Sequence, residues 1–248
     1  MIITIDNPRK FYFEITKVTI VIGLIFLAVG YLIGNVMPIT KNSPIGPEQY
    51  AITSTIGGDQ LSKPGSMNFV IPKYVNFQGS ESANLDLVEF GDYQCPFCEK
   101  FFQNTEPQIV KDYIATGKVK FYFVDFDLVG PDSITLSEGA WCADEQGKYY
   151  EYHDYTYSHQ GSENSGWGSL DKVKSFASDL GLDAQKFNTC LDSKKYEPRI
   201  QQLYQLGQNL GITGTPTMFI GNEKIGFTKI TGAQPYDVFQ QVMNSYLQ

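Results

Sequence analysis

Basic residues and histidines are scarce in this 248-residue chain, which has 19 lysines and arginines, 27 acidic residues and two histidines. The net charge of −8 argues against a protein that binds nucleic acid or an anionic lipid surface, because both need a basic face. We attribute the acidity to solubility.

Internal repeats are also absent from the sequence: no segment recurs with a period of 20–50 residues, which excludes a solenoid. Hydrophobic residues make up 42% of the chain, a share that is ordinary for a globular protein and too low for a membrane protein with many spans. The length allows one domain of about 180 residues with extensions.

One long apolar run is present, over residues 18–37, and it contains no formal charge. A helix of 20 residues is long enough to cross a hydrocarbon core of about 30 Å. Arg9, Lys10 and Lys17 precede the run, so the positive-inside rule predicts a cytoplasmic segment at 1–17, a transmembrane anchor at 18–37 and an extracytoplasmic remainder. A cleaved signal peptide is the alternative, but its apolar part is usually shorter and ends in a small-x-small site, which this run lacks.

Residues 38–66 follow the apolar run and contain several prolines and glycines without apolar periodicity. We expect a flexible linker there, and a folded domain over 67–248.

The domain has patterns typical of both strands and helices. Strands are expected over 69–78, 85–90, 119–126, 217–220 and 224–230. Helices are expected over 96–117, 133–157, 169–180, 184–209 and 235–247. This order predicts an α/β fold: a small sheet with a helical insertion over about 132–210, preceded by one transmembrane helix.

Cys95 and Cys98 form a CxxC motif between a predicted strand and a predicted helix, with Pro96 in the first helical turn. A helix N-terminus stabilises a thiolate, the reactive form of cysteine, so the motif indicates redox chemistry. A zinc site is the alternative and needs four ligands. Because Cys142 and Cys190 are isolated in the sequence, we expect no metal site. The two histidines, His153 and His159, are expected to be core or surface residues and not ligands.

Glu89 lies on the strand before the motif, where alternation places it on the same face as Leu85 and Leu87. The pattern leaves two possibilities equally open: a glutamate that exchanges protons with Cys98, or a solvated one. Further along, Thr215-Pro216 precedes a strand and is by itself compatible with an ordinary trans turn.

Two motifs together resemble the DsbA-like branch of the thioredoxin superfamily. They are Val88-Glu89-Phe90-Gly91-Asp92-Tyr93-Gln94-Cys95-Pro96-Phe97-Cys98 and, after the helical insertion, Gly214-Thr215-Pro216-Thr217-Met218-Phe219-Ile220. The resemblance covers about residues 66–248. It implies a thioredoxin-like fold with an inserted helical domain.

The resemblance also implies the roles of individual residues. Cys95 matches the nucleophile and Cys98 the resolving cysteine. Glu89 matches a buried acidic residue, and Pro216 matches a cis-proline that faces the disulfide. Thr215 is then expected to offer its backbone to an extended substrate.

The two residues between the cysteines, Pro96 and Phe97, are also expected to contact the substrate. They depart from the best-known members, which have Pro-His at these positions. Because the histidine helps to stabilise the thiolate in those members, extreme oxidising power is not expected here.

Cys142 and Cys190 remain, each on a predicted helix of the insertion. Paired cysteines outside the cytoplasm usually oxidise, and the proximity of the CxxC pair leaves Cys142–Cys190 as a second disulfide. Similar second pairs in DsbA-like proteins support this pairing. Two buried free thiols are the alternative.

We therefore predict an enzyme without a cofactor that forms disulfides in secreted or membrane proteins by dithiol–disulfide exchange. The resemblance implies a quinone-linked membrane oxidase as its electron acceptor. The predicted location is the cell membrane, with one span, a cytoplasmic N-terminus and an extracytoplasmic catalytic domain. The alternatives are a reductase or isomerase fed by a membrane electron donor, and a metallochaperone that binds metal through the CxxC motif.

Overall fold

The computed structural model describes residues 61–248 of the chain. The expected cytoplasmic segment, anchor and most of the linker, over residues 1–60, lie outside the described residues. Across residues 61–248, none of the helices has the length and apolar character that a membrane span needs.

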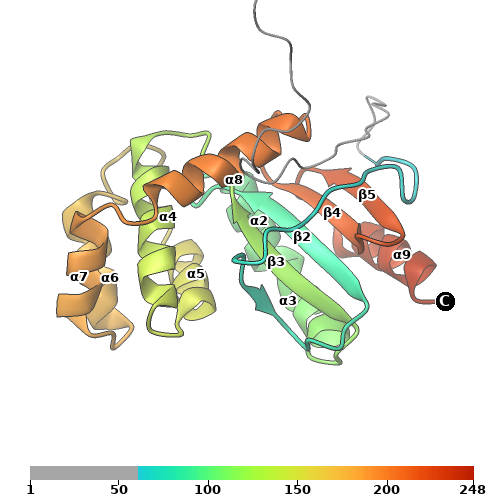
Figure 1. The fold of residues 1–248 in the computed structure, drawn as a ribbon, viewed down its shortest axis with the longest axis horizontal. Helices are drawn as coiled ribbons and strands as arrows, with labels where there is room; N and C mark the ends of the chain where they lie inside the picture. Colours follow the sequence, from blue (N-terminus) through green and yellow to red (C-terminus); the bar gives the residue numbers. More distant parts are fainter. Residues whose placement is uncertain (1–60) are drawn as a thin grey trace, which may run out of the picture. The chain divides into compact units, whose positions relative to one another are not determined.

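A five-stranded mixed sheet forms the centre of the fold (Figure 1). Its strands are β1 (Phe77–Gln78), β2 (Leu85–Gly91), β3 (Val119–Asp125), β4 (Thr217–Asn222) and β5 (Gly226–Thr231). They lie in the order β1-β3-β2-β4-β5, in which β2 and β3 are parallel and all other neighbours are antiparallel. The central strand β2 is buried along its whole length, so the turn that follows it starts from inside the protein.

The helices follow or connect the strands of this sheet along the chain. They are α2 (Pro96–Asn104), α3 (Glu106–Ile109), the π-helical η1 (Val110–Ile114), α4 (Pro131–Asp144), α5 (Tyr149–Ser158), α6 (Leu170–Asp179), α7 (Ala184–Asp192), α8 (Glu197–Asn209) and α9 (Tyr236–Tyr246). The fold is therefore the expected thioredoxin-like α/β fold with a helical insertion between β3 and β4.

Three expected helices are interrupted, each for a local reason. Pro107 lacks the N–H group needed to continue α2, so the chain starts a new helix at Glu106. Gly147, with a φ of +68°, ends α4 and separates it from α5. Lys194 has a φ of +50°, and Pro198 follows it in the first turn of α8. These two residues together separate α7 from α8.

The expected strand over residues 69–78 is almost entirely wrong, because only Phe77–Gln78 pairs with the sheet. Pro72 has no N–H for a ladder, and its carbonyl instead accepts a hydrogen bond from the amide of Val75 in a turn. The start of the segment packs through its side chain: the ring of Phe69 stacks on that of Phe227, with centroids 4.3 Å apart.

Alternation along β2 separates two environments. The ring of Phe90 packs against those of Phe69, Phe126 and Phe219 on one face of the sheet. Glu89 points to the other face, where its carboxyl group interacts with Cys95 and Glu106. The strand thus places one acidic side chain beneath the helix that carries the CxxC motif.

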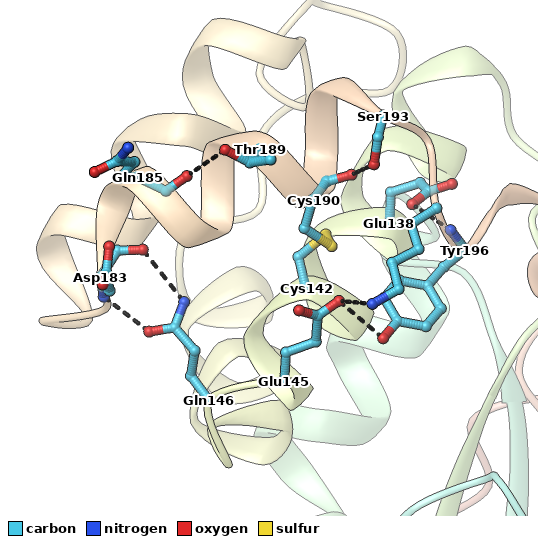
Figure 2. The surroundings of a disulfide bond; sticks show 11 residues. Glu138, Cys142, Glu145, Gln146, Asp183, Gln185, Thr189, Cys190, Ser193 and Tyr196 are labelled. Atoms are coloured by element: carbon cyan, nitrogen blue, oxygen red, sulfur yellow. Dashed lines mark hydrogen bonds and ion pairs between the residues drawn. A yellow bond between two sulfur atoms is a disulfide. The ribbon is translucent and has the colours of Figure 1, made fainter.

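Helices α4, α5, α6 and α7 gather beside the sheet, at the left of Figure 1, and α8 leads back toward it. A disulfide joins Cys142 of α4 to Cys190 of α7, with Cα atoms 5.8 Å apart and a sequence separation of 48. This is the second disulfide expected from the sequence. Figure 2 shows it beside Glu145, which accepts hydrogen bonds from the Lys195 ammonium group (2.7 Å) and the Tyr196 hydroxyl (3.0 Å).

Candidate active site

The CxxC motif lies at the N-terminus of α2. Cys95 is the N-cap residue, with extended backbone angles (φ −73°, ψ 120°), and Pro96 occupies the first turn. The Cys95 carbonyl accepts the amide protons of Cys98 and Glu99, both at 3.1 Å. Its side chain therefore lies at the positive end of the helix.

The two cysteines are free thiols in the structure, and they differ in access to solvent. Cys95 is 6% exposed and Cys98 is fully buried. Between them, Phe97 is 60% exposed and Pro96 is also exposed, so both are accessible to a bound protein.

The pKa of Cys95 is lowered from 9.0 to about 6. The hydrogen bond with the Cys98 side chain is the largest cause, and burial opposes it. The Thr215 side chain and the backbone amides of Cys98 and Phe97 lower the pKa further. The Cys95 thiol also lies 3.3 Å from the Thr215 carbonyl oxygen, an acceptor that only the protonated form can use. The net effect of these contacts is a pKa of about 6, which favours the thiolate at neutral pH.

Cys98 has the opposite shift. Burial raises the pKa of its thiol well above the usual range, and the hydrogen bond with the Cys95 side chain and, when Glu89 is ionised, its carboxylate raise it further. The pair therefore consists of one acidic thiol that is slightly exposed and one fully buried thiol that holds its proton.

Glu89 is 1% exposed, so the possibility of a solvated glutamate is wrong. Its Oε1 atom has no hydrogen-bond partner. Burial raises the pKa of its carboxyl group well above the usual range, with smaller contributions from Glu106 and Cys95. A buried carboxyl group that keeps its proton to higher pH than an exposed one, and lies near the two cysteines, can give or take a proton during their chemistry.

The loop before β4 brings a distant part of the chain to Cys95. The Thr215–Pro216 peptide bond is cis, as the resemblance predicted. The carbonyl of Pro216 accepts the amide proton of Gly232 (2.8 Å), and the Thr217 hydroxyl donates to the Gly214 carbonyl (2.7 Å). These bonds hold the loop in position, and its contact with the motif is the 3.3 Å approach of Thr215 to Cys95.

Polar residues that the sequence analysis passed over hold the turn before the motif. Asp92 is fully buried, and its carboxylate accepts the amide protons of Gln94, Leu128 and Val129, each at 2.8 Å. The Gln160 side chain donates to the Cys95 carbonyl (3.2 Å) from just after α5. The one feature of the sequence that could have identified these residues was a cluster of polar residues in a turn that follows a buried strand.

Gln94 connects this turn to the helical insertion. Its side-chain NH₂ group donates to the Ser133 hydroxyl (2.9 Å), and its side-chain oxygen accepts the amide proton of Asn164 (2.7 Å). The insertion thus fixes the backbone that leads into Cys95.

Comparison with known proteins adds the following. A family model described as Thioredoxin matches residues 73–244. Disulfide bond formation protein D of Bacillus subtilis is 29% identical over 175 residues, which cover 68% of this chain and 75% of the relative. A probable disulfide bond formation protein D of Bacillus cereus is 27% identical over 146 residues, 57% of this chain and 68% of the relative.

Solved structures agree in fold. The oxidised BdbD of Bacillus subtilis superposes with a TM-score of 0.62 at 23% identity, covering 69% of this chain and 91% of that one. The α-DsbA1 of Wolbachia pipientis gives the same TM-score at 24% identity, covering 71% and 92%.

Proposed function

Because this chain belongs to the thioredoxin family, as a DsbA-like thiol–disulfide oxidoreductase, we propose that it forms disulfides in secreted or membrane proteins through Cys95 and Cys98. The observation that supports this most is the inequality of the two thiols: Cys95 has a pKa of about 6 at a helix N-terminus, whereas Cys98 is buried and keeps its proton. The more stable the Cys95 thiolate, the more readily the oxidised motif gives up its disulfide.

The reaction starts from the oxidised enzyme, with a Cys95–Cys98 disulfide. A substrate thiolate attacks the sulfur of Cys95, which forms a mixed disulfide and releases Cys98 as a thiolate. A second substrate thiolate then attacks the substrate sulfur of the mixed disulfide. The substrate disulfide forms and Cys95 leaves as a stable thiolate, so two electrons have passed from substrate to enzyme.

Glu89 has a role in the first of these steps. The buried Cys98 thiolate needs a proton, because burial disfavours its charge. The protonated Glu89 carboxyl supplies that proton as the Cys95–Cys98 bond breaks, and it takes the proton back when the motif is reoxidised.

The substrate lies between the cis-proline loop and the exposed dipeptide of the motif. Thr215 and Pro216 present backbone beside Cys95, which suits an extended peptide, whereas Pro96 and Phe97 supply apolar surface. This arrangement tolerates many substrate sequences, because backbone contacts carry no side-chain specificity.

The reduced enzyme needs an acceptor for its two electrons, and we assign this role to a quinone-linked oxidase of the membrane. The predicted anchor at residues 18–37 would keep the domain beside such a partner at a high effective concentration. The charge distribution around that run supports a cytoplasmic N-terminus and an extracytoplasmic catalytic domain.

Trapping of mixed disulfides tests this function. The Cys98→Ser variant should accumulate mixed disulfides with secreted proteins in cells, because the enzyme cannot resolve them, and the matched Cys95→Ser variant should trap none. Equilibration of the wild type with glutathione should give a potential more oxidising than about −230 mV, between those of thioredoxin and DsbA. A potential at or below that of thioredoxin, together with a reduced motif in cells, would instead indicate a reductase.

A further inference from the structure

A second group of chemistry-bearing side chains lies outside the CxxC motif and the cis-proline loop. Glu106 is the first residue of α3, and His153 and Asp154 are neighbours on α5. One potential ligand atom from each of the three lies within 4.8 Å of the others. Within residues 61–248 this is the only such group of three, and Cys95 and Cys98 are not part of it.

Two members of the group are buried with an unpaired polar atom. Glu106 is 5% exposed and its Oε2 atom has no hydrogen-bond partner. His153 is fully buried and its Nε2 atom has none either. In the described part of the chain, Glu106 forms no salt bridge that could compensate for its burial. An unpaired buried polar group costs about 1–3 kcal/mol, so its presence calls for a partner.

The third member opens the group to solvent. The side chain of Asp154 is 53% exposed, and its Oδ1 atom lies 2.9 Å from Nδ1 of His153. A ligand can therefore reach the group from the surface along Asp154, while His153 and Glu106 form its inner side.

The surroundings of His153 fix its orientation. Its ring is in contact with six aromatic rings, those of Tyr93, Phe102, Phe121, Phe123, Tyr150 and Tyr157. The closest is Phe123, with centroids 4.8 Å apart. An imidazole held in this way, with little freedom to rotate, loses little entropy when it binds a ligand.

We propose that Glu106, His153 and Asp154 bind a divalent transition metal of the zinc class. One imidazole nitrogen and two carboxylates are a donor set that zinc accepts, and three protein ligands plus water are typical of an open zinc site. Calcium is disfavoured, because it takes oxygen ligands and the histidine would not suit it. The proposal replaces the expectation that the histidines are not ligands and that the chain has no metal site.

A cation at this position would join the two parts of the fold. Glu106 belongs to the helical connection between β2 and β3, and the other two ligands belong to the insertion. Metal binding would therefore stabilise the attachment of the insertion to the thioredoxin-like part, in addition to the hydrogen bonds of Gln94.

The test uses Zn²⁺ alone and the full chain in detergent, with the motif oxidised so that Cys95 and Cys98 cannot bind metal. Isothermal titration calorimetry should give one Zn²⁺ per chain for the wild type. Glu106→Gln and Asp154→Asn should each weaken binding at least tenfold, because an amide is a poor zinc ligand. The control is Glu151→Gln, which changes an exposed carboxylate on the same helix and should keep the wild-type affinity.

Thermal unfolding provides the second measurement. At the same Zn²⁺ concentration, the melting temperature of the oxidised wild type and of Glu151→Gln should rise, and that of Asp154→Asn should rise clearly less. Because Asp154 is largely exposed, this variant should fold normally. Absence of Zn²⁺ binding by the oxidised wild type would overturn the proposal, and so would an unchanged affinity in both ligand variants.

Discussion

Residues 95 and 98 are the same amino acid and yet have opposite acid–base behaviour, because their surroundings differ. Cys95 ends a strand-to-helix turn and receives hydrogen bonds from Cys98 and the backbone. Cys98, one turn further, is enclosed by the protein, and burial raises the pKa of its thiol well above the usual range. At this scale, position relative to the helix N-terminus decides which thiol reacts.

The first prediction concerns the titration of Cys95. In the reduced protein, alkylation by iodoacetamide should rise with pH around a midpoint near 6. In Cys98→Ala the midpoint should move up, because the hydrogen bond that lowers the pKa most is removed. A midpoint near 9 in the wild type would contradict the assignment of Cys95 as the acidic thiol.

The same shift has a consequence for stability. The folded pKa of about 6 lies below the usual value of 9, so the contribution to stability is complete above about pH 9 and is lost as the pH falls to about 6. The free energy of unfolding of the reduced wild type should therefore increase from pH 6 to 8.5 relative to that of Cys95→Ala, measured in urea.

The second prediction concerns Glu89, whose pKa is raised in the folded state. The contribution of this carboxyl group to the free energy of unfolding is complete below its usual pKa of 4.5. It is lost as the pH rises, because the buried carboxyl resists ionisation. Glu89→Gln removes this cost, so the variant should be more stable than the wild type at pH 8 by about 1–3 kcal/mol, and by less at pH 5. Denaturant unfolding at both pH values measures the difference.

Glu89→Gln should also reduce the rate of disulfide transfer by about tenfold or more, because the proton donor for Cys98 is lost. Glu81→Gln is the matched control, since Glu81 is exposed in the turn before β2. A variant that is less stable at pH 8 and equally active would refute the proton-transfer role.

At the scale of elements, the structure depends on how the turn before α2 is attached to the insertion. Asp92 and Gln94 in this turn bond to Leu128 and Ser133, and Gln160 donates to the Cys95 carbonyl from beyond α5. The α2 N-terminus is therefore positioned by the insertion as well as by β2.

The third prediction follows from this attachment. Gln94→Ala removes three hydrogen bonds, one to Ser133 and two to Asn164, and leaves the amide of Asn164 unpaired, which should lower the free energy of unfolding by about 2 kcal/mol. Gln103→Ala on α2, which removes only an exposed side-chain bond to Glu99, should have little effect. Urea denaturation compares the two variants. Equal stabilities would show that the attachment by Gln94 is unimportant.

The boundaries of the helices and strands show where the local sequence pattern fails to predict the structure. Alternation and β-branched residues predicted β2 and β3 to within one residue at each end, because both strands are buried in the sheet. The helix expected over 96–117 is in fact α2, α3 and η1. The apolar period continued through Pro107, and the break there depends on backbone hydrogen bonding, which hydrophobic spacing does not report.

At the scale of the whole molecule, the described domain comes after 60 residues that include the apolar run. The fourth prediction is that the full chain remains in membranes after washing with alkaline carbonate, because residues 18–37 are long enough to span the bilayer. A variant that lacks residues 1–37 should be released. Protease added from the outer side should degrade the domain of the full chain, and a natural product that begins near residue 38 would instead indicate a cleaved signal peptide.

The sequence by itself determined the fold class and the CxxC motif at a helix start, and it favoured the pairing of Cys142 with Cys190 that the structure confirms. These depend on local spacing, on residue types and on there being few cysteines to pair. The cis-proline loop also came from the sequence, but only by resemblance, since its own pattern suggested a trans turn.

Only the tertiary structure decided the burial of Glu89, the opposite pKa shifts of the two cysteines and the contact of Thr215 with Cys95 across 120 residues. The group of Glu106, His153 and Asp154 also appears only there, because its members come from two helices of different parts of the chain. Burial, charge and ligand geometry depend on which side chains the fold brings together, and no window of sequence contains that information.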